Sequence, residues 1–423
     1  MEPKKYNAFN KIGRFFKVLG PGLVTGSSDD DPSGIATYSQ AGAQFGFSTL
    51  WTALITFPLM ASMQEMCARI GLVTTKGLTS TLKVHYPKWI LWVMIIFSFP
   101  AIVLNIGADI AGMGAAANLI IPVVPTFVFS IIFTILILLA VVFYPYQKIA
   151  AILKWVCVTL LVYFMVPFFT KINWADVLKS TFLPSIHFNK TYISILVGIL
   201  GTTISPYLFF WQATMEAEDI KHNAHTIIVN KKILNTMRKD VDFGMLFSNL
   251  VMFFIILTCG AVLFPNGIHE IDTVEEAALA LKPIAGNMAY LLFAVGIIGT
   301  GFLAIPVLSG SISYMLAETF DWNQGLDKKF FEAKPFYYVI IISLVVGLFI
   351  NFLGISPVQG LIYSAILYGL TSPIIILIVL HISNNKKIMG VHVNGRLSNI
   401  LGWLTFALMA ISAAALIYLQ FES

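Results

Sequence analysis

Charged side chains are scarce in this sequence. Asp, Glu, Lys and Arg make up only 11% of its 423 residues, whereas hydrophobic residues make up 58%. A soluble globular domain carries roughly 25% charged residues. The shortage of charge therefore excludes a soluble catalytic domain and indicates a chain that crosses a lipid bilayer many times.

Cysteine is also rare, and its occurrences form no motif. Cys67, Cys157 and Cys259 all fall in apolar segments, and no C-x-x-C pair is present. This excludes a disulfide framework and predicts buried, small apolar side chains. The first residues lead into an apolar segment without a small-residue cleavage site, so we expect no signal peptide.

Long apolar runs, by contrast, fill most of the chain. A helix needs about 20 mostly apolar residues to cross a bilayer, and eleven segments meet this requirement. The expected helices are 15–43, 47–73, 90–118, 126–144, 147–170, 192–218, 241–264, 286–317, 336–353, 356–380 and 398–419. They predict an all-α polytopic membrane protein with a single transmembrane domain over residues 1–423. Only residues 144–147 separate the fourth and fifth helices, which predicts a tight hairpin.

Basic residues are distributed unevenly between the expected loops. With the N-terminus in the cytoplasm, only Lys171, Lys179, Lys190 and Lys282 of the 26 Lys and Arg residues fall outside. Lys and Arg are enriched in cytoplasmic loops. We therefore expect a protein of the cytoplasmic membrane with its N-terminus inside and its C-terminus outside. The lipid bilayer is an expected partner, and nothing implies nucleic acid or an obligate protein partner.

Three consecutive carboxylates lie inside the first expected helix. Asp29, Asp30 and Asp31 precede Pro32 and Gly34. A charged side chain at the centre of a membrane helix costs on the order of 2.5–3.5 kcal/mol, so such a run indicates function. Pro32 and Gly34 break the helix and free backbone carbonyl groups beside the negative charge. The break predicts a cation site with Asp31 as the best ligand, and Asp29 or Asp30 as the cap of the second half-helix.

The sixth expected helix carries a second interruption, at residues 201–207. Pro206 removes a backbone donor and clashes with the preceding turn, while Thr202, Thr203 and Ser205 supply hydroxyl groups. Interruptions at matching positions of two halves predict a transporter with inverted repeats whose breaks meet near the bilayer midplane. We expect five helices per repeat, with the repeats at about 15–170 and 192–380 and an extra helix at about 398–419.

The expected site contains only hard oxygen donors, because neither break contains Met, Cys or His. Such donors suit Mg²⁺, Ca²⁺ or Mn²⁺, whereas soft metals prefer sulfur or imidazole. Mg²⁺ usually keeps several waters, so one or two carboxylates with small hydroxyl side chains fit a partly hydrated Mg²⁺. Asp30, Thr203 and Tyr207 are expected around the site or along the pathway. Asp109 in the third helix is a further intramembrane carboxylate and a candidate for function.

Other polar groups carry weaker signals. Glu216, Glu218, Asp219 and His222 follow the sixth helix and are expected at a solvated helix end, with a role at the mouth of the pathway as the alternative. Gln64 and Arg69, near the end of the second helix, are expected at a cytoplasmic interface.

Several of these motifs resemble the Nramp family of divalent-metal transporters, which has the leucine-transporter fold. Residues 20–22 followed by 31–34 resemble the family's first helix, where the motif reads D-P-G-N. Residues 68–71 and 74–78 resemble the end of its second helix. Residues 201–207 resemble its sixth-helix segment, which ends in M-P-H. The resemblance spans most of the chain.

The departures from the family pattern concern the site itself. Gly34 replaces the family's Asn ligand, and Ser205 replaces its metal-binding Met. Tyr207 takes the place of the histidine of M-P-H. Gly112 stands where the family has a second acid on helix 3, and Ala365 where it has a Gln on helix 10. Loss of the thioether removes the preference for soft metals, and loss of the His and the acid argues against proton coupling. This pattern resembles the Nramp-related magnesium transporters, a branch that moves Mg²⁺ and Mn²⁺ without obligatory proton coupling.

The resemblance implies that Asp31, Gly34, Thr202 and Ser205 surround the transported Mg²⁺ or Mn²⁺, with no other cofactor. The leading hypothesis is import by alternating access, favoured by a membrane potential worth about 2.3 kcal/mol per charge per 100 mV. One alternative is a proton-coupled Mn²⁺/Fe²⁺ symporter of ordinary Nramp type. The intramembrane carboxylate of Asp109 is consistent with this alternative. A second is an amino-acid permease of the same fold, whose carboxylate substrate the aspartates would repel. We expect no enzyme, because no intramembrane protease motif accompanies the aspartates.

Overall fold

The computed structural model describes residues 21–144, 148, 160–222, 229–352 and 354–421. Within these ranges the regular elements are helical. The α-helices are α2 (Pro21–Asp29), α3 (Pro32–Phe45), α4 (Trp51–Thr74), α5 (Leu78–His85), α6 (Lys88–Ile120), α7 (Thr126–Phe143), α9 (Leu161–Phe169), α10 (Trp174–Phe182), α11 (Lys190–Thr203), α12 (Pro206–His222), α13 (Lys231–Val262), α14 (Val274–Ala278), α15 (Lys282–Ala285), α16 (Ala289–Phe320), α17 (Lys334–Ile350), α18 (Pro357–Asn384), α19 (Lys386–Met389) and α20 (Arg396–Phe421).

Most of the expected membrane spans coincide with these helices. In the described part of the chain, seven helical segments are long and apolar enough to cross a membrane, with the α11–α12 pair counted as one of them, and α17 is a shorter apolar helix. The broken pair α2–α3 and helix α4 occupy the first two expected spans. Only α9 represents the fifth span, because most of 147–170 and the expected hairpin at 144–147 lie outside the described residues, as does Cys157.

Both expected helix breaks are present. Helix α2 ends at Asp29 and α3 begins at Pro32, so the first break comprises Asp30 and Asp31 and lies slightly before the expected 31–34. Helix α11 ends at Thr203 and α12 begins at Pro206. Each second half-helix begins with proline because the first position of a helix needs no N–H donor and favours the fixed proline φ.

Helix α13 supports both halves of the first broken helix by close backbone contact. A Cβ atom on Gly26 of α2 would lie 2.2 Å from the carbonyl oxygen of Gly244, and one on Gly42 of α3 would lie 2.4 Å from that of Ile256. Only glycine permits such an approach between membrane helices. The first break is therefore held between two half-helices that are both anchored on α13.

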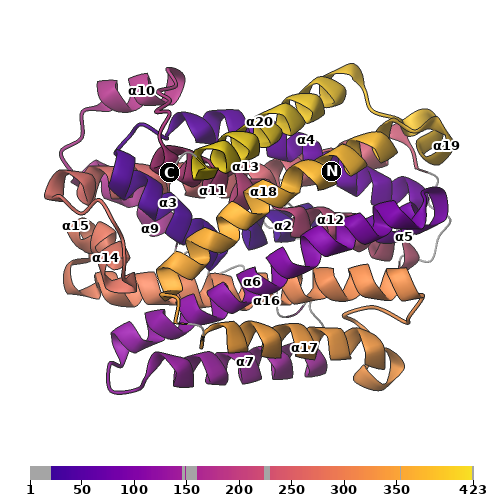
Figure 1. The fold of residues 1–423 in the computed structure, drawn as a ribbon, viewed down its shortest axis with the longest axis horizontal. Coiled ribbons are helices and arrows are strands. Elements are labelled where there is room, and N and C mark those ends of the chain that lie inside the picture. The colour runs from indigo at the N-terminus through magenta and orange to yellow at the C-terminus, as the bar shows by residue number, and fades with distance from the viewer. Residues whose placement is uncertain (1–20, 145–147, 149–159, 223–228, 353, 422–423) are drawn as a thin grey trace, which may run out of the picture.

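The short loop helices gather at two opposite ends of the molecule, with α10, α14 and α15 at one end and α5 and α19 at the other (Figure 1). At the first end, Gln40 of α3 donates to the carbonyl oxygen of His269 across 3.1 Å and accepts from the N–H of Ile271 across 2.9 Å. At the other end, the N–H of Gly22 in α2 donates to Asp240 Oδ2 across 2.7 Å. Both ends of the broken helix are thus bonded to α13 or to the segment that follows it.

Candidate cation site at the helix breaks

Asp31 is the N-cap of α3. Its Oδ1 accepts hydrogen bonds of 2.7 Å from both the Ser33 hydroxyl and the Gly34 N–H. The expectation that Asp29 or Asp30 caps this half-helix is wrong, because the residue directly before the first turn is the one whose carboxylate reaches the N–H groups of that turn. The helix start therefore engages one oxygen of Asp31, while the other oxygen faces α6.

The second oxygen of Asp31 meets a residue that the sequence did not single out. Asn105 of α6 donates from Nδ2 to Asp31 Oδ2 across 2.8 Å, and its Oδ1 accepts from the hydroxyl of Ser364 in α18 across 2.7 Å. Asn105 Nδ2 also lies 3.4 Å from Oδ2 of Asp109, one helical turn along α6. Asn105, Asp109 and Ser364 are fully buried. The sequence did contain a signal for Asn105: an asparagine four residues before a carboxylate in an apolar helix lies on the same face as that carboxylate.

Asp29 and Asp30 face α13 instead. The hydroxyl of Ser248 lies 2.6 Å from Asp29 Oδ2 and 3.2 Å from Asp30 Oδ1. The remaining oxygen of each carboxylate is buried and has no hydrogen-bond partner among the described residues. Because a hydroxyl carries a single proton, Ser248 donates to one of these carboxylates at a time. The region around the first break is thus rich in oxygen atoms and poor in donors, which favours a cation.

The second break lies against the first. A Cβ atom on Gly34 would be 3.2 Å from Thr202 Oγ1, so the first turn of α3 contacts the last turn of α11. The Ser205 hydroxyl lies within hydrogen-bond distance of the carbonyl oxygens of Gly201 and Thr202 in that turn, and donates to one of them at a time. The structure therefore brings Asp31, Gly34 and Thr202 together, while Ser205 satisfies backbone groups that the break leaves without partners.

Two tyrosines connect the breaks further. The Tyr207 hydroxyl of α12 donates to the carbonyl oxygen of Ser28 in α2 across 2.9 Å. The Tyr38 hydroxyl of α3 lies 3.1 Å from Thr203 Oγ1 of α11. Each contact joins one half of the first broken helix to one half of the second. The two breaks thus face each other, as expected for a site between interrupted helices.

A carboxylate cluster alone does not form the site. In the part of the chain that the structure describes, no group of three or more His, Cys, Asp or Glu side chains could hold a metal ion. A cation at Asp31 therefore needs hydroxyl, amide or carbonyl oxygens as further ligands. One thioether borders the region, since Met252 Sδ of α13 lies 3.6 Å from Thr203 Oγ1.

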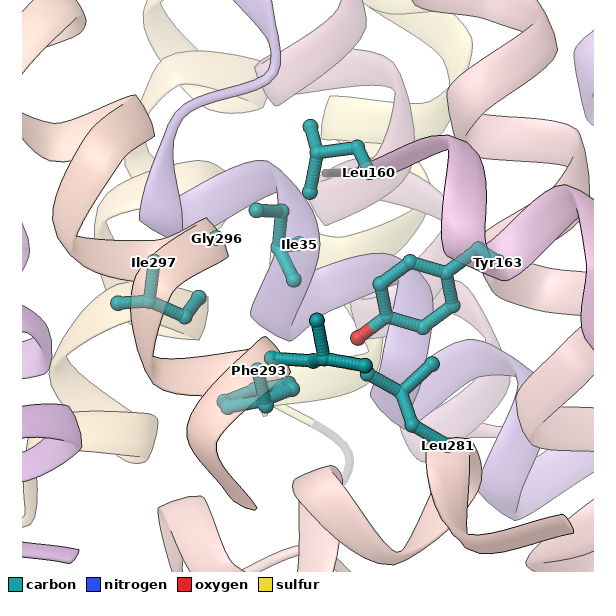
Figure 2. A pocket seen from close by; sticks show the side chains of 8 residues that line it. Ile35, Leu160, Tyr163, Leu281, Phe293, Gly296 and Ile297 are labelled. Atoms are coloured by element: carbon teal, nitrogen blue, oxygen red, sulfur yellow. The ribbon is translucent and has the colours of Figure 1, made fainter. Parts of the chain in front are cut away.

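A small cavity between α3, α9 and α16 is apolar (Figure 2). Its volume is about 10 Å³, which is at the lower limit for a single water molecule. The hydroxyl of Tyr163 faces it, beside Ile35 and Phe293 (Figure 2). This lining offers too few oxygen ligands for a cation, so the cavity is a packing gap beside the first turn of α3.

A larger cavity of about 450 Å³ lies where α12 and α16 end. Four acidic residues contribute to its lining: Glu218, Glu318, Asp321 and Asp327. The expectation of a solvated helix end is wrong for Glu216, which is only 5% exposed and accepts from Gln212 Nε2 across 3.0 Å. Glu216 therefore faces the protein interior and Glu218 lines an acidic cavity, whereas Asp219 closer to the helix end is exposed.

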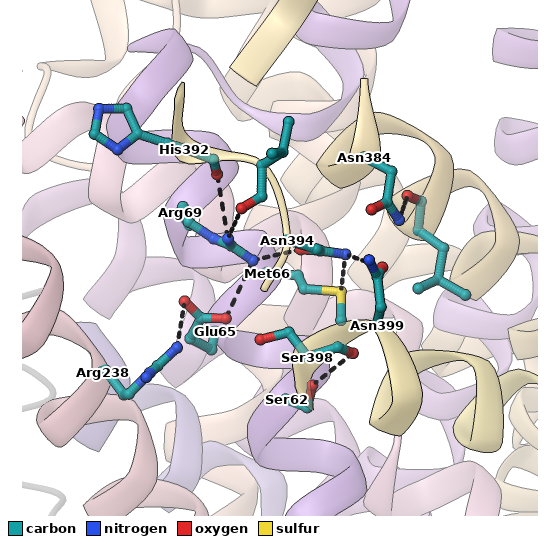
Figure 3. A network of polar contacts seen from close by, with 12 residues as sticks. Ser62, Glu65, Met66, Arg69, Arg238, Asn384, His392, Asn394, Ser398 and Asn399 are labelled. Carbon is teal, nitrogen blue, oxygen red and sulfur yellow. Dashed lines mark hydrogen bonds and ion pairs between the residues drawn. The ribbon is translucent and has the colours of Figure 1, made fainter. Parts of the chain in front are cut away.

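Arg69 is the centre of a buried polar network near the end of α4 (Figure 3). Its guanidinium donates to the backbone carbonyl oxygens of His392 and Val393, both across 3.1 Å, and also to the side chain of Asn394. It pairs with Glu65 at 3.3 Å, and the other oxygen of Glu65 lies 3.6 Å from Arg238 of α13. The network ties α4 to α13 and to the segment before α20. Gln64 beside it is 1% exposed.

Comparison with known proteins gives a consistent result. Residues 22–419 match the sequence model of the family described as natural resistance-associated macrophage protein-like (Nramp). The divalent metal cation transporter MntH of Caldanaerobacter subterraneus subsp. tengcongensis is 26% identical over 421 residues, covering 97% of this chain and 95% of that protein. MntH of Bacillus subtilis is 24% identical over 404 residues, covering 92% and 89%.

The crystal structure of the Eremococcus coleocola manganese transporter, in complex with an aromatic bis-isothiourea substituted compound, superposes with a TM-score of 0.78. The alignment covers 99% of this chain and 89% of that one at 18% identity. The chain therefore has the fold of that transporter, and the expected all-helical leucine-transporter fold is confirmed.

Proposed function

The chain belongs to the Nramp family of divalent metal transporters, and from that premise we propose that its cargo is Mg²⁺, with Mn²⁺ as a second substrate. Import proceeds by alternating access across the cytoplasmic membrane. Asp31, the backbone at Gly34, Thr202 and Ser205 surround the ion during transport. Proton movement is not obligatory in this mechanism.

The oxygen atoms around Asp31 are the observation that supports Mg²⁺. The side chains that contact this carboxylate belong to Ser33 and Asn105, and each carries an oxygen atom but no sulfur or imidazole. At the second break, the side chain nearest to Gly34 is the Thr202 hydroxyl. Hard oxygen ligands suit Mg²⁺ and Mn²⁺. The two breaks are in contact in this conformation, and the small side chains at positions 34 and 205 leave little volume to displace when they separate around an ion that keeps part of its water shell.

The absence of an imidazole at position 207 supports uncoupled transport. Tyr207 uses its hydroxyl for the Ser28 carbonyl and offers no group that titrates near neutral pH in this position. The inward membrane potential acts on both charges of a divalent ion, at about 2.3 kcal/mol per charge per 100 mV. That driving force makes a proton partner unnecessary for import.

Uptake of Mn²⁺ into proteoliposomes tests this function. We expect millimolar Mg²⁺ to reduce Mn²⁺ uptake strongly, and a pH-sensitive dye inside the vesicles to report no acidification that scales with metal entry. Uptake that Mg²⁺ leaves unchanged, or acidification in proportion to Mn²⁺, contradicts the proposal.

The second candidate is a proton-coupled Mn²⁺/Fe²⁺ symporter. Two observations favour it: Asp109 has a buried Oδ1 without a hydrogen-bond partner among the described residues, and the Met252 thioether borders Thr203. The solved neighbour is also named a manganese transporter. The same vesicle experiment separates the two functions. The symporter requires Mn²⁺ uptake that Mg²⁺ does not reduce, together with acidification of the vesicle interior.

A further inference from the structure

We propose that Asn105 is a ligand that switches: its side-chain amide rotates so that Oδ1 binds a cation held by Asp31. The inference rests on the proposed role of Asp31 as a metal ligand. It adds to the site a neutral oxygen from α6 that favours hard cations.

The orientation of the amide is defined by its neighbours. Nδ2 faces two carboxylate oxygens, Asp31 Oδ2 at 2.8 Å and Asp109 Oδ2 at 3.4 Å, whereas Oδ1 faces the Ser364 hydroxyl at 2.7 Å. An amide nitrogen only donates and a carbonyl oxygen only accepts. The arrangement therefore places the donor side of Asn105 on the two carboxylates.

This arrangement conflicts with a cation at Asp31 Oδ2. An N–H group and a cation compete for the same carboxylate oxygen, and the positive end of the N–H dipole repels the ion. A half-turn of the amide exchanges the two atoms and presents Oδ1 in place of Nδ2. The terminal torsion of an asparagine side chain is broad, so this turn requires no change of the other side-chain dihedral.

Ser364 allows the turned amide to keep a hydrogen bond to α18. Its hydroxyl also lies 2.8 Å from the carbonyl oxygen of Leu361, which can take the hydroxyl proton. The hydroxyl oxygen then accepts from the turned Nδ2, since a hydroxyl both donates and accepts. In the turned orientation the cation replaces Nδ2 as the partner of Asp31 Oδ2, while Asp109 Oδ2 gives up its 3.4 Å contact with Nδ2. Without a cation the original orientation is favoured, because it leaves fewer buried carboxylate oxygens unsatisfied.

The distances also fit a shared ion. After the turn, Oδ1 replaces Nδ2 and lies about as far from Asp31 Oδ2 as Nδ2 does now, 2.8 Å. Neighbouring ligands of an octahedral Mg²⁺ with bonds of 2.0–2.1 Å are about 2.9 Å apart. Asp31 and Asn105 are thus spaced as two adjacent ligands of one small cation, with Asp109 one helical turn away.

A pair of variants of similar size tests whether this side chain touches the ion. Asn105→Met and Asn105→Leu both remove the amide donor, but only Met carries a ligand atom, and its Sδ occupies the same position along the side chain as Oδ1. Equilibrium binding of Mg²⁺ and of Cd²⁺ to the purified full-length protein is measured for both variants. Thioethers bind soft metals, so we expect Asn105→Met to bind Cd²⁺ about tenfold or more tightly than Asn105→Leu, with equal Mg²⁺ affinities.

Equal Cd²⁺ affinities in the two variants overturn the inference, because a residue that only positions Asp31 does not distinguish sulfur from carbon. Size-exclusion profiles establish that both variants are folded. The same exchanges at Asn118, which donates to the carbonyl oxygen of Val124 near the end of α6, serve as controls and leave both affinities unchanged. Asp31→Ala is measured in parallel: retained Mg²⁺ binding there contradicts the proposed site itself, independently of Asn105.

Discussion

The hydroxyl of Tyr207 donates a hydrogen bond of 2.9 Å to the carbonyl oxygen of Ser28. The carbonyl belongs to the last turn of α2, where a helix leaves its C=O groups without internal partners. The tyrosine lies in the first turn of α12, the second half of the other broken helix. One hydrogen bond thus satisfies a backbone group at the first break and fixes the second break beside it.

We predict that Tyr207→Phe destabilises the protein by about 1–3 kcal/mol, because it leaves the buried Ser28 carbonyl unsatisfied. Thermal unfolding of the purified protein measures this. The control is Tyr290→Phe, since that hydroxyl makes only a 3.5 Å contact with Glu275 at the surface. Equal melting temperatures for both variants would mean that the contact between the breaks has no energetic role.

Ser248 is predicted to be important for stability although it is a small hydroxyl residue. Ser248→Ala removes the hydrogen-bond donor that Asp29 and Asp30 share, and leaving charged or polar buried groups unsatisfied costs about 1–3 kcal/mol. Chemical denaturation compares it with Ser194→Ala, whose exposed hydroxyl bonds only to its own helix at the Lys190 carbonyl. A variant at 248 as stable as the one at 194 would contradict the assignment.

The two arginines that contact Glu65 are predicted to differ. Arg69→Gln breaks a buried network and is expected to cost about 3–5 kcal/mol, the range for loss of one partner of a buried ion pair. The side chain of Arg238 is 54% exposed, so Arg238→Gln is expected to cost at most about 1 kcal/mol. Unfolding experiments on both variants test this. A similar loss in both would show that the α4–α13 contact, rather than the segment at 392–394, carries the stability.

Ser205→Met is predicted to shift selectivity from Mg²⁺ toward softer metals, because it introduces a thioether beside Thr202 at the second break. The matched variant is Ser205→Leu, which adds similar volume without sulfur. Uptake of Cd²⁺ and Mg²⁺ in vesicles is compared for the two. The prediction is a higher Cd²⁺ to Mg²⁺ ratio for Met alone; the same ratio in both would place residue 205 away from the ion.

Local rules predicted the breaks. Pro32 and Pro206 each start a half-helix, since proline disrupts a helix interior but suits a first turn. The sequence also identified the residues that meet there, because Gly34 contacts Thr202 as expected of paired interruptions. These features depend on residues that are close in sequence and on the repeat of a pattern.

The partners of the carboxylates depend instead on tertiary packing. Asn105 lies on another helix from Asp31, and Ser248 approaches Asp29 from α13 far along the chain. The assignment of the α3 cap to Asp29 or Asp30 failed for a local reason, since Asp31 is the residue next to the helix start. The prediction that Glu216 is solvated was wrong because the sequence shows only a charged residue near a helix end. Its contact with Gln212 and its burial are visible only in the folded structure.

Mg²⁺ uptake by proteoliposomes that contain Asp31→Ala tests the central claim most directly. Wild-type vesicles should accumulate Mg²⁺, reported by an enclosed fluorescent indicator, when the interior is held negative. The Asp31→Ala protein, reconstituted in equal amount and eluting as a folded species, should show no uptake above protein-free vesicles. Uptake at the wild-type rate by this variant would contradict the account, because the cation site would then lie elsewhere.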